Sequence, residues 1–479
     1  MVVLGASISC SCSCSGSNVW GDATDRTYGT NGTYKLSQAV NHRRTVTPII
    51  RARGRGRARG RGRYGAAPTK LGSLRDPPCR YRKTARQTPK PSMSFHSKMA
   101  PMRSHRLLAC DGGGMRGLIS IEVLAKLEKD LRSLSGKPTL VLADFFDYVG
   151  GTSCGAIVAA LIAMGKPMDD IRTFFISSCP DMFLKARLWE RWHSKFRNDA
   201  LSARLRALFG DAKLGSDRLQ TLLMLVLSNA STNSPWPVCN NPAAKYNDRR
   251  LPDCNLELPL WQLVRASTAA PTYFPPEVIH VGTRPFVFVD GAMTMYHNPA
   301  FQLFLMATTD VYQLGWEVGA DRLLLISIGS GNSTGTEGNL SPQEMNILYH
   351  ASRVPAALLA AAQQEQDFLC RIFGETLEGE PLDSEIGDMQ GHGIRGGQKL
   401  FSYIRYNAEL SRAGLDWLGL PNVDPAHVHP MDAVEFLDEV QQIGVALAER
   451  KVKPEHFARF VPEELTANGH EQNRDHNRR

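Results

Sequence analysis

The stretch Gly151-Thr152-Ser153-Cys154-Gly155 decides how this chain is interpreted. It follows the apolar run 145–149 and precedes the alanine-rich segment 156–164, a pattern that predicts a buried strand, a turn and a helix. Glycines on both sides of the serine allow strand and helix to approach closely and leave its hydroxyl exposed at the helix N-terminus. The helix dipole favours negative charge there, so Ser153 is a candidate nucleophile. The pentapeptide alone also fits an ordinary glycine-rich turn.

A second glycine-rich stretch, Asp111-Gly112-Gly113-Gly114-Met115-Arg116-Gly117, separates a predicted strand at 106–110 from a predicted helix at 118–134. Three of its glycines satisfy G-x-G-x-x-G, the dinucleotide-binding pattern. That pattern also requires an acidic residue about 20 residues further on, at the end of the next strand. The chain continues instead with the apolar run 139–143 and the serine turn. A nucleotide-binding protein that uses the glycines of 112–117 therefore remains an alternative.

Short apolar strands alternate with helices as far as residue 335. Strands are expected at 221–228, 285–289 and 322–327, helices within 166–216 and at 261–269 and 298–307, and a loop at 230–256. Such alternation predicts an α/β fold with a mostly parallel central sheet covered by helices. Functional groups gather at the carboxyl ends of strands in such sheets. Asp111, Ser153 and Asp290 all follow predicted strands and are expected to share one crevice.

Composition separates a basic leader, residues 1–103, from the rest of the chain. Residues 1–104 contain 20 Lys and Arg against 3 Asp and Glu, whereas the remainder contains 36 against 44. With its Arg/Gly run at 53–63, this low-complexity leader is predicted to be disordered. It is interpreted as an RNA-binding tail, an organelle transit peptide, or an extension upstream of a true start at Met93, Met99 or Met102. The folded part is not expected to bind nucleic acid specifically.

The remaining boundaries follow from pattern. Residues 104–335 are predicted to form the main α/β domain, 336–465 a mostly helical region packed on it, and 466–479 a disordered polar tail. Helices are expected at 341–365 and 432–451, and a strand at 402–406. The ten cysteines include no CxxC pair and favour a reducing compartment. Without a long apolar run or a clear secretory signal, a cytoplasmic protein with at most peripheral membrane contact is expected.

Three motifs stand in a fixed order: the glycine stretch 111–117, the serine turn 151–155, and Asp290-Gly291-Ala292. With residues 266–276, they resemble the patatin-like phospholipase family, and especially its bacterial lipid acyl hydrolases. The resemblance covers about residues 105–310 and implies the three-layer patatin-like fold. The mostly helical remainder, including residues 401–407, is more weakly similar to the C-terminal region of bacterial patatin-like enzymes. Cys154 stands where Thr, Ser or Gly is usual, and Ala156 replaces a common second glycine; neither change removes a group that the chemistry needs.

The resemblance implies a serine–aspartate dyad. Ser153 would attack an ester carbonyl and Asp290 would accept its proton without a histidine. Partial desolvation would raise the pKa of that carboxyl group toward the working pH. The backbone N–H groups of Gly113 and Gly114 would form the oxyanion hole. Arg116 would orient the glycine loop, bind a lipid phosphate or form a structural salt bridge, and no metal or cofactor is required.

The resemblance leaves the lipid open among glycerophospholipids, lysophospholipids, neutral lipids and galactolipids. Contact with membrane lipids would be peripheral, through apolar lips of the crevice and a candidate region at Trp189–Trp192. A competing esterase interpretation is an α/β-hydrolase triad, in which His392, His427 or His429 would complete the site. The oligomeric state is not predicted.

Overall fold

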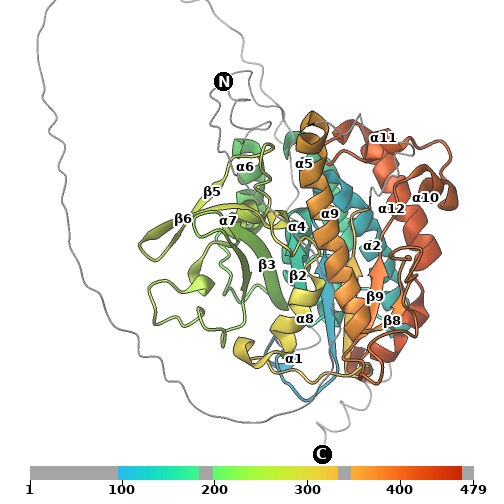
Figure 1. Cartoon of the computed structure of the whole chain (residues 1–479). Helices are drawn as coiled ribbons and strands as arrows, with labels where there is room; N and C mark the ends of the chain where they lie inside the picture. Colours follow the sequence, from blue (N-terminus) through green and yellow to red (C-terminus); the bar gives the residue numbers. More distant parts are fainter. Residues whose placement is uncertain (1–94, 183–197, 333–346, 466–479) are drawn as a thin grey trace, which may run out of the picture. The chain divides into compact units, whose positions relative to one another are not determined.

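The computed structural model describes residues 95–182, 198–332 and 347–465 (Figure 1). The predicted leader up to residue 94, the Trp189–Trp192 region and the predicted tail 466–479 lie outside these residues. Contacts divide the chain into units 1–84 and 85–479, and the described residues all belong to the second.

A nine-stranded sheet organises the described residues, in the order β5-β6-β3-β2-β1-β7-β9-β8, with β4 paired to β3. Parallel pairing joins six strands: β1 (His105–Cys110), β2 (Tyr148–Thr152), β3 (Leu222–Asn229), β7 (Leu323–Ile328), β8 (Glu375–Glu378) and β9 (Ser402–Tyr406). Antiparallel pairing adds β4 (Ser234–Cys239), β5 (Glu277–Val281) and β6 (Arg284–Asp290). The prediction of a mostly parallel sheet is confirmed.

Helices cover both faces of the sheet. They are α1 (Phe95–Lys98), α2 (Gly117–Ser135), α3 (Leu142–Phe145), α4 (Cys154–Ala163), α5 (Met168–Met182), α6 (Asn198–Phe209), α7 (Leu260–Ser267), α8 (Ala300–Thr308), α9 (Ile347–Phe373), α10 (Arg412–Trp417), α11 (Pro425–Val428) and α12 (Leu437–Lys451). Successive strand residues point to opposite faces, so Leu108 packs with α2 and α4, whereas Leu107 packs with α8. The three-layer α/β architecture is therefore confirmed. None of the described helices is long and apolar enough to cross a membrane.

The region after residue 336 contributes to the sheet as well as to the helical layers. β9 pairs with β7 over the predicted strand 402–406, and β8 pairs with β9 at the edge. α12 packs along α2 (Figure 1). α9 ends at residue 373, beyond the predicted 365, and α12 begins at 437, after a short 3-10 turn, instead of at 432. This region thus shares one hydrophobic core with residues 104–335.

Two local predictions were wrong. The predicted loop 230–256 contains the strand β4, in which Pro235 and Pro237 give the sequence a loop-like composition. Because β4 is an edge strand that pairs only with β3, it does not need every backbone N–H group and tolerates proline. The strand before Ser153 spans 148–152 instead of 145–149, since Gly150 and Gly151 continue β2 and residue 145 ends α3.

The described folded part begins before the predicted boundary at residue 104. The Lys98 side chain of α1 is buried and donates hydrogen bonds to the carbonyl oxygens of Ala143 and Phe146. Arg103 forms an ion pair with Asp147, the residue before β2. Residues 95–103 are therefore anchored to residues 143–147 by polar contacts.

Candidate active site

Ser153 occupies a strained turn between β2 and α4. Its φ of 55° and ψ of −123° lie in a region that residues with a side chain rarely adopt. The turn depends on both flanking glycines: a Cβ on Gly151 would lie 2.2 Å from the Gly155 carbonyl oxygen, and one on Gly155 would lie 2.3 Å from the Cys110 carbonyl oxygen. This geometry holds the Ser153 hydroxyl out of the backbone, as the sequence pattern predicts.

The residues beside Ser153 have structural roles. Thr152 donates a hydrogen bond from Oγ1 to the Tyr296 carbonyl oxygen at 2.6 Å. Cys154 is buried and packs close to Gly117, where α2 and α4 meet. Burial raises the pKa of the Cys154 thiol to about 12, so it stays protonated at neutral pH.

Asp290, at the end of β6, contacts the serine directly. The Ser153 hydroxyl donates a hydrogen bond to Asp290 Oδ2 at 2.7 Å. The other carboxylate oxygen, Oδ1, accepts from the Ala292 N–H at 2.8 Å. Gly291 permits this turn because a Cβ there would lie 2.1 Å from the Val226 carbonyl oxygen. The two side chains that the motifs nominate are thus brought into contact from strands far apart in the sequence.

The environment of Asp290 makes its carboxylate a stronger base. Only 2% of the residue is exposed. Burial raises the pKa of Asp290 from 3.8 to about 6, while hydrogen bonds from Ser153 and the Ala292 N–H and the charge of Arg265 partly oppose that rise. At neutral pH the carboxylate is mostly ionised, yet it accepts a proton far more readily than an exposed aspartate.

The glycine loop presents two free N–H groups beside the serine. Gly112 donates its N–H to the His297 carbonyl oxygen at 3.2 Å, and Met115 donates its N–H to the Met431 carbonyl oxygen at 2.9 Å. Among the residues that the structure describes, no acceptor is bonded to the N–H groups of Gly113 and Gly114. Both of these glycines line the same cavity as Ser153. Their N–H groups are therefore candidate donors for an oxyanion.

The cavity above Ser153 has a volume of about 590 Å³ and mostly apolar walls. Its lining comprises Gly113, Gly114, Ser153, Cys154, Ile157, Phe175, Cys179, Leu201, Thr268, Ala270, Pro271, Thr272, Tyr273, Phe274, Asp290, Ala292, Met293, His297, Ala356, Leu359 and Met431. Its size lies within the range usual for small-molecule sites. A nucleophile with its base at the wall of an apolar cavity suits a substrate that carries a hydrocarbon chain next to an ester.

Arg116 is buried behind the glycine loop without an acidic partner in the described part of the chain. Its Nε and Nη1 atoms have no hydrogen-bond partner there, and none of the described carboxylates forms an ion pair with it. Burial lowers the pKa of the guanidinium group, which nevertheless stays charged at neutral pH. The predicted alternative of a structural salt bridge finds no counterpart among these residues. A buried, unpaired cation favours negative charge nearby.

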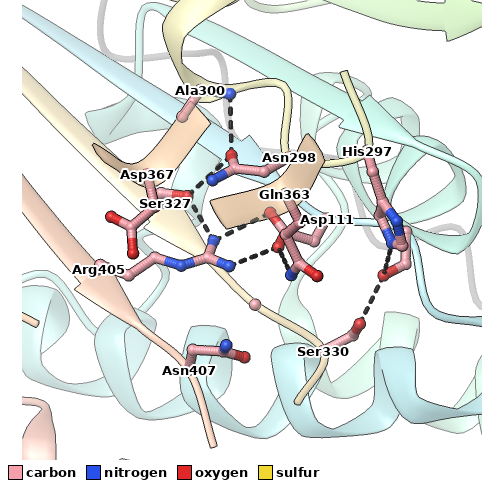
Figure 2. Close-up of polar contacts among 12 residues, drawn as sticks. Asp111, His297, Asn298, Ala300, Ser327, Ser330, Gln363, Asp367, Arg405 and Asn407 are labelled. Atoms are coloured by element: carbon pink, nitrogen blue, oxygen red, sulfur yellow. Dashed lines mark hydrogen bonds and ion pairs between the residues drawn. The ribbon is translucent and has the colours of Figure 1, made fainter. Parts of the chain in front are cut away.

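Asp111 does not join the crevice, contrary to the expectation from its place at the end of β1. Its fully buried carboxylate accepts two hydrogen bonds from Arg405 of β9, at 3.0 Å and 2.6 Å (Figure 2). Gln363 of α9 donates a further hydrogen bond to it. The Arg405 guanidinium also donates to Ser327 of β7. The Asp111 side chain thus ties the glycine loop to the C-terminal region.

None of the three histidines proposed for a triad contacts Ser153 or Asp290. His427 pairs with Glu439 at 3.1 Å, His429 bonds to the Leu410 carbonyl oxygen at 3.0 Å, and His392 lies on an exposed loop. Sequence reasoning missed the histidine that does line the cavity, His297, and three residues of the C-terminal region, Ala356, Leu359 and Met431. The position of His297 shortly after Asp290 was the only signal for it; the other three belong to no motif.

The nucleotide-binding alternative finds no support at the strand that should carry its acidic residue. The strand after the glycine loop, β2, ends at Thr152 and is followed by Ser153. Gly113 and Gly114, whose N–H groups have no acceptor among the described residues, line a cavity that is also lined by the serine and its carboxylate. An acyl-transfer site explains this combination, because it needs a nucleophile, a base and oxyanion donors together.

Comparisons with known proteins point in the same direction. Residues 108–304 match the family model described as patatin-like phospholipase. Patatin-like protein 1 of Arabidopsis thaliana is 28% identical over 323 residues, which cover 57% of this chain and 75% of that protein. Patatin-17 of Solanum cardiophyllum is 28% identical over 252 residues, covering 48% of this chain and 61% of its own length. The solved structure of VipD from Legionella pneumophila aligns with 73% of this chain and 67% of VipD, at 12% identity and a TM-score of 0.31.

Proposed function

Because residues 108–304 belong to the patatin-like phospholipase family, a family of ester hydrolases, we propose that this chain cleaves fatty acyl esters of membrane lipids through a Ser153–Asp290 dyad. The observation that carries this proposal is the hydrogen bond of 2.7 Å from the serine hydroxyl to the aspartate carboxylate. Both groups line one apolar cavity of about 590 Å³.

In the first half of the reaction, Ser153 Oγ attacks the carbonyl carbon of the ester while its proton passes to Asp290 Oδ2. The carbonyl oxygen becomes an oxyanion, which receives hydrogen bonds from the N–H groups of Gly113 and Gly114. When the tetrahedral intermediate collapses, the bond to the leaving alcohol breaks, and the alcohol oxygen takes the proton from Asp290. An acyl group remains on Ser153.

In the second half, water attacks the acyl carbonyl carbon and gives its proton to Asp290, and the same N–H groups stabilise the second oxyanion. Collapse releases the fatty acid, and the Ser153 oxygen takes the proton back. One carboxylate thus serves as base and then as acid in each half. A pKa of about 6 suits both tasks, because a group that titrates near the working pH is available as a base and, once protonated, as an acid.

Arg116 supports the same chemistry by its charge. Its guanidinium group lies buried behind the loop that carries the two N–H donors and has no described acidic partner. The low-dielectric surroundings strengthen its attraction for an oxyanion or for a lipid phosphate. We favour the oxyanion, because Arg116 does not line the cavity.

Membrane contact is proposed at the outer edge of the cavity. Met293 lines the cavity and is half exposed, and α9 contributes Ala356 and Leu359 to the wall while exposing Val354 and Leu358. Leu358 is 65% exposed and, together with Val354 and Met293, gives this edge the apolar character expected of a lipid-contacting surface. Replacing Leu358 with glutamate should slow turnover of vesicles and spare that of a water-soluble ester. Equal loss on both substrates would argue against lipid contact at this edge.

The hydrolase proposal is tested by giving vesicles of mixed phospholipids, galactolipids and neutral lipids to the full chain and following fatty acid release by mass spectrometry. The variants are Ser153→Ala and Asp290→Ala, with Ser133→Ala as a matched control, because Ser133 is exposed on α2. Release by the wild type and the control, and its loss in both site variants, is the expected result. Release that survives Ser153→Ala would overturn the proposal.

A further inference from the structure

Two buried side chains converge on one carbonyl oxygen of the glycine loop. The Gly112 carbonyl oxygen accepts a hydrogen bond from Ser330 Oγ at 2.5 Å and a second from His297 Nε2 at 3.0 Å (Figure 2). The Gly112 N–H bonds in turn to the His297 carbonyl oxygen. Ser330 is 1% exposed and His297 is 6% exposed, so both hydrogen bonds lie in the interior of the protein, shielded from water.

The geometry of a peptide unit gives this arrangement a consequence for the cavity. In a planar trans peptide the C=O of one residue and the N–H of the next point in opposite directions. Two donors on the Gly112 oxygen therefore direct the Gly113 N–H away from themselves. Gly113 lines the cavity, and its N–H has no acceptor among the described residues. The orientation of the oxyanion donor is thus set from behind the loop.

External support is needed because the loop lacks stiffness of its own. Three successive glycines have wide conformational freedom, and without contacts this peptide plane would rotate. Close packing complements the hydrogen bonds: a Cβ on Gly113 would lie 2.0 Å from Ser330 Oγ, and one on Gly112 would lie 3.1 Å from the His297 ring and 3.3 Å from Ser153 Cβ. The same clearances show that His297 lies beside the nucleophile.

We propose that His297 and Ser330 are positioning residues, which hold the Gly112–Gly113 peptide so that its N–H group stabilises the oxyanion. This inference rests on the proposed hydrolase function and adds two residues to its machinery. Donation to the carbonyl oxygen also polarises the peptide and strengthens the N–H as a donor. His297 acts as a neutral imidazole that donates from Nε2, while its Nδ1 has no described partner.

The neutral state of His297 separates this role from that of a catalytic base. Burial lowers the pKa of His297, and its Nε2 hydrogen bond requires no change of protonation during turnover. Glutamine can place an amide N–H near the position of the imidazole Nε2, whereas leucine fills the space without a donor. A positioning role therefore predicts rescue by glutamine, with the pH midpoint of turnover unchanged.

The test compares Ser330→Ala, His297→Leu, His297→Gln and the Ser330→Ala/His297→Leu double variant on a water-soluble ester. The second readout is inhibition by a trifluoromethyl ketone, whose adduct with Ser153 is tetrahedral. Since loss of an oxyanion donor costs about 100- to 1,000-fold in kcat, each single loss should cost about 10-fold and the double variant about 100-fold. KM should stay within about twofold, the inhibition constant should weaken in proportion to kcat, and His297→Gln should recover most activity.

The possible outcomes distinguish failure of the positioning inference from failure of the hydrolase proposal. If the wild type hydrolyses the ester but Ser330→Ala and His297→Leu match it, the positioning inference fails while the hydrolase proposal stands. A loss in His297→Gln equal to that in His297→Leu, with a shifted pH midpoint, would overturn positioning in favour of a base. If the wild type neither hydrolyses the ester nor reacts with a fluorophosphonate at Ser153, both proposals fail. Ser330→Ala removes one oxygen atom only, so its result decides the case if a His297 variant does not fold.

Discussion

Replacing Asp290 with asparagine should abolish hydrolysis and make the folded protein more stable at neutral and alkaline pH. The carboxylate is buried, and burial raises its pKa from 3.8 to about 6 in the folded state. The stabilisation that the protonated Asp290 side chain provides is therefore complete below pH 3.8, the pKa in the unfolded state. It is lost as the pH rises through about 6, the pKa in the folded state. Asparagine retains an oxygen for the Ala292 N–H and carries no charge, so it avoids that loss.

The size of the effect follows from the two pKa values. One pKa unit corresponds to about 1.4 kcal/mol, so the raised pKa of Asp290 destabilises the wild type, relative to an uncharged side chain, by about 3 kcal/mol at pH 8 and about 1 kcal/mol at pH 4.5. Altered hydrogen bonding in the variant also changes the free energy of unfolding, but by the same amount at both pH values. The advantage of Asp290→Asn over the wild type should consequently grow by about 2 kcal/mol between these two pH values.

Urea unfolding of the full chain at both pH values measures this difference. Asp211→Asn serves as the control for the same substitution at an exposed aspartate, because the Asp211 side chain is fully exposed. An advantage of Asp290→Asn that does not change with pH would refute the reasoning. It would mean that the buried carboxylate has no raised pKa and no particular strength as a base.

Three further predictions concern the same site and its support. Hydrolysis of a water-soluble ester needs ionised Asp290, so kcat/KM should fall about tenfold per pH unit below about 6; a flat profile there would contradict this. Arg116→Met should lower kcat by about 10- to 100-fold in initial-rate measurements, whereas a change confined to KM would point to substrate binding. Arg405→Met should reduce the free energy of unfolding by about 3–5 kcal/mol, and adding Asp111→Asn should recover part of it; no loss would show that the buried pair is dispensable.

Much of the fold and the contact between Ser153 and Asp290 could be predicted because their signals are local. Ser153 and Asp290 each stand at the end of an apolar strand and beside glycines that a sharp turn requires. Their order along the chain supported the family assignment, which the family model over residues 108–304 confirms. Alternating strands and helices sufficed for a mostly parallel, three-layer architecture.

The supporting contacts could not be predicted because they depend on pairing between distant segments. Asp111 was expected in the crevice, but its side chain meets Arg405 across the sheet order β1-β7-β9, which no local pattern encodes. Met431 reaches the glycine loop through a backbone hydrogen bond, and backbone groups carry no sequence signature. Ser330 and His297 look like ordinary loop residues until the fold brings both to the Gly112 oxygen.

The central claim is that Ser153 carries the acyl group during turnover. Rapid mixing of the full chain with a short-chain phospholipid, acid quenching within the first turnover and peptide mass spectrometry measure this directly. The dyad predicts an acyl adduct on Ser153 that forms at least as fast as kcat, forms far more slowly in Asp290→Asn and is absent from Ser153→Ala. Turnover at full rate with no adduct on Ser153, or with the adduct on another residue, would contradict the account.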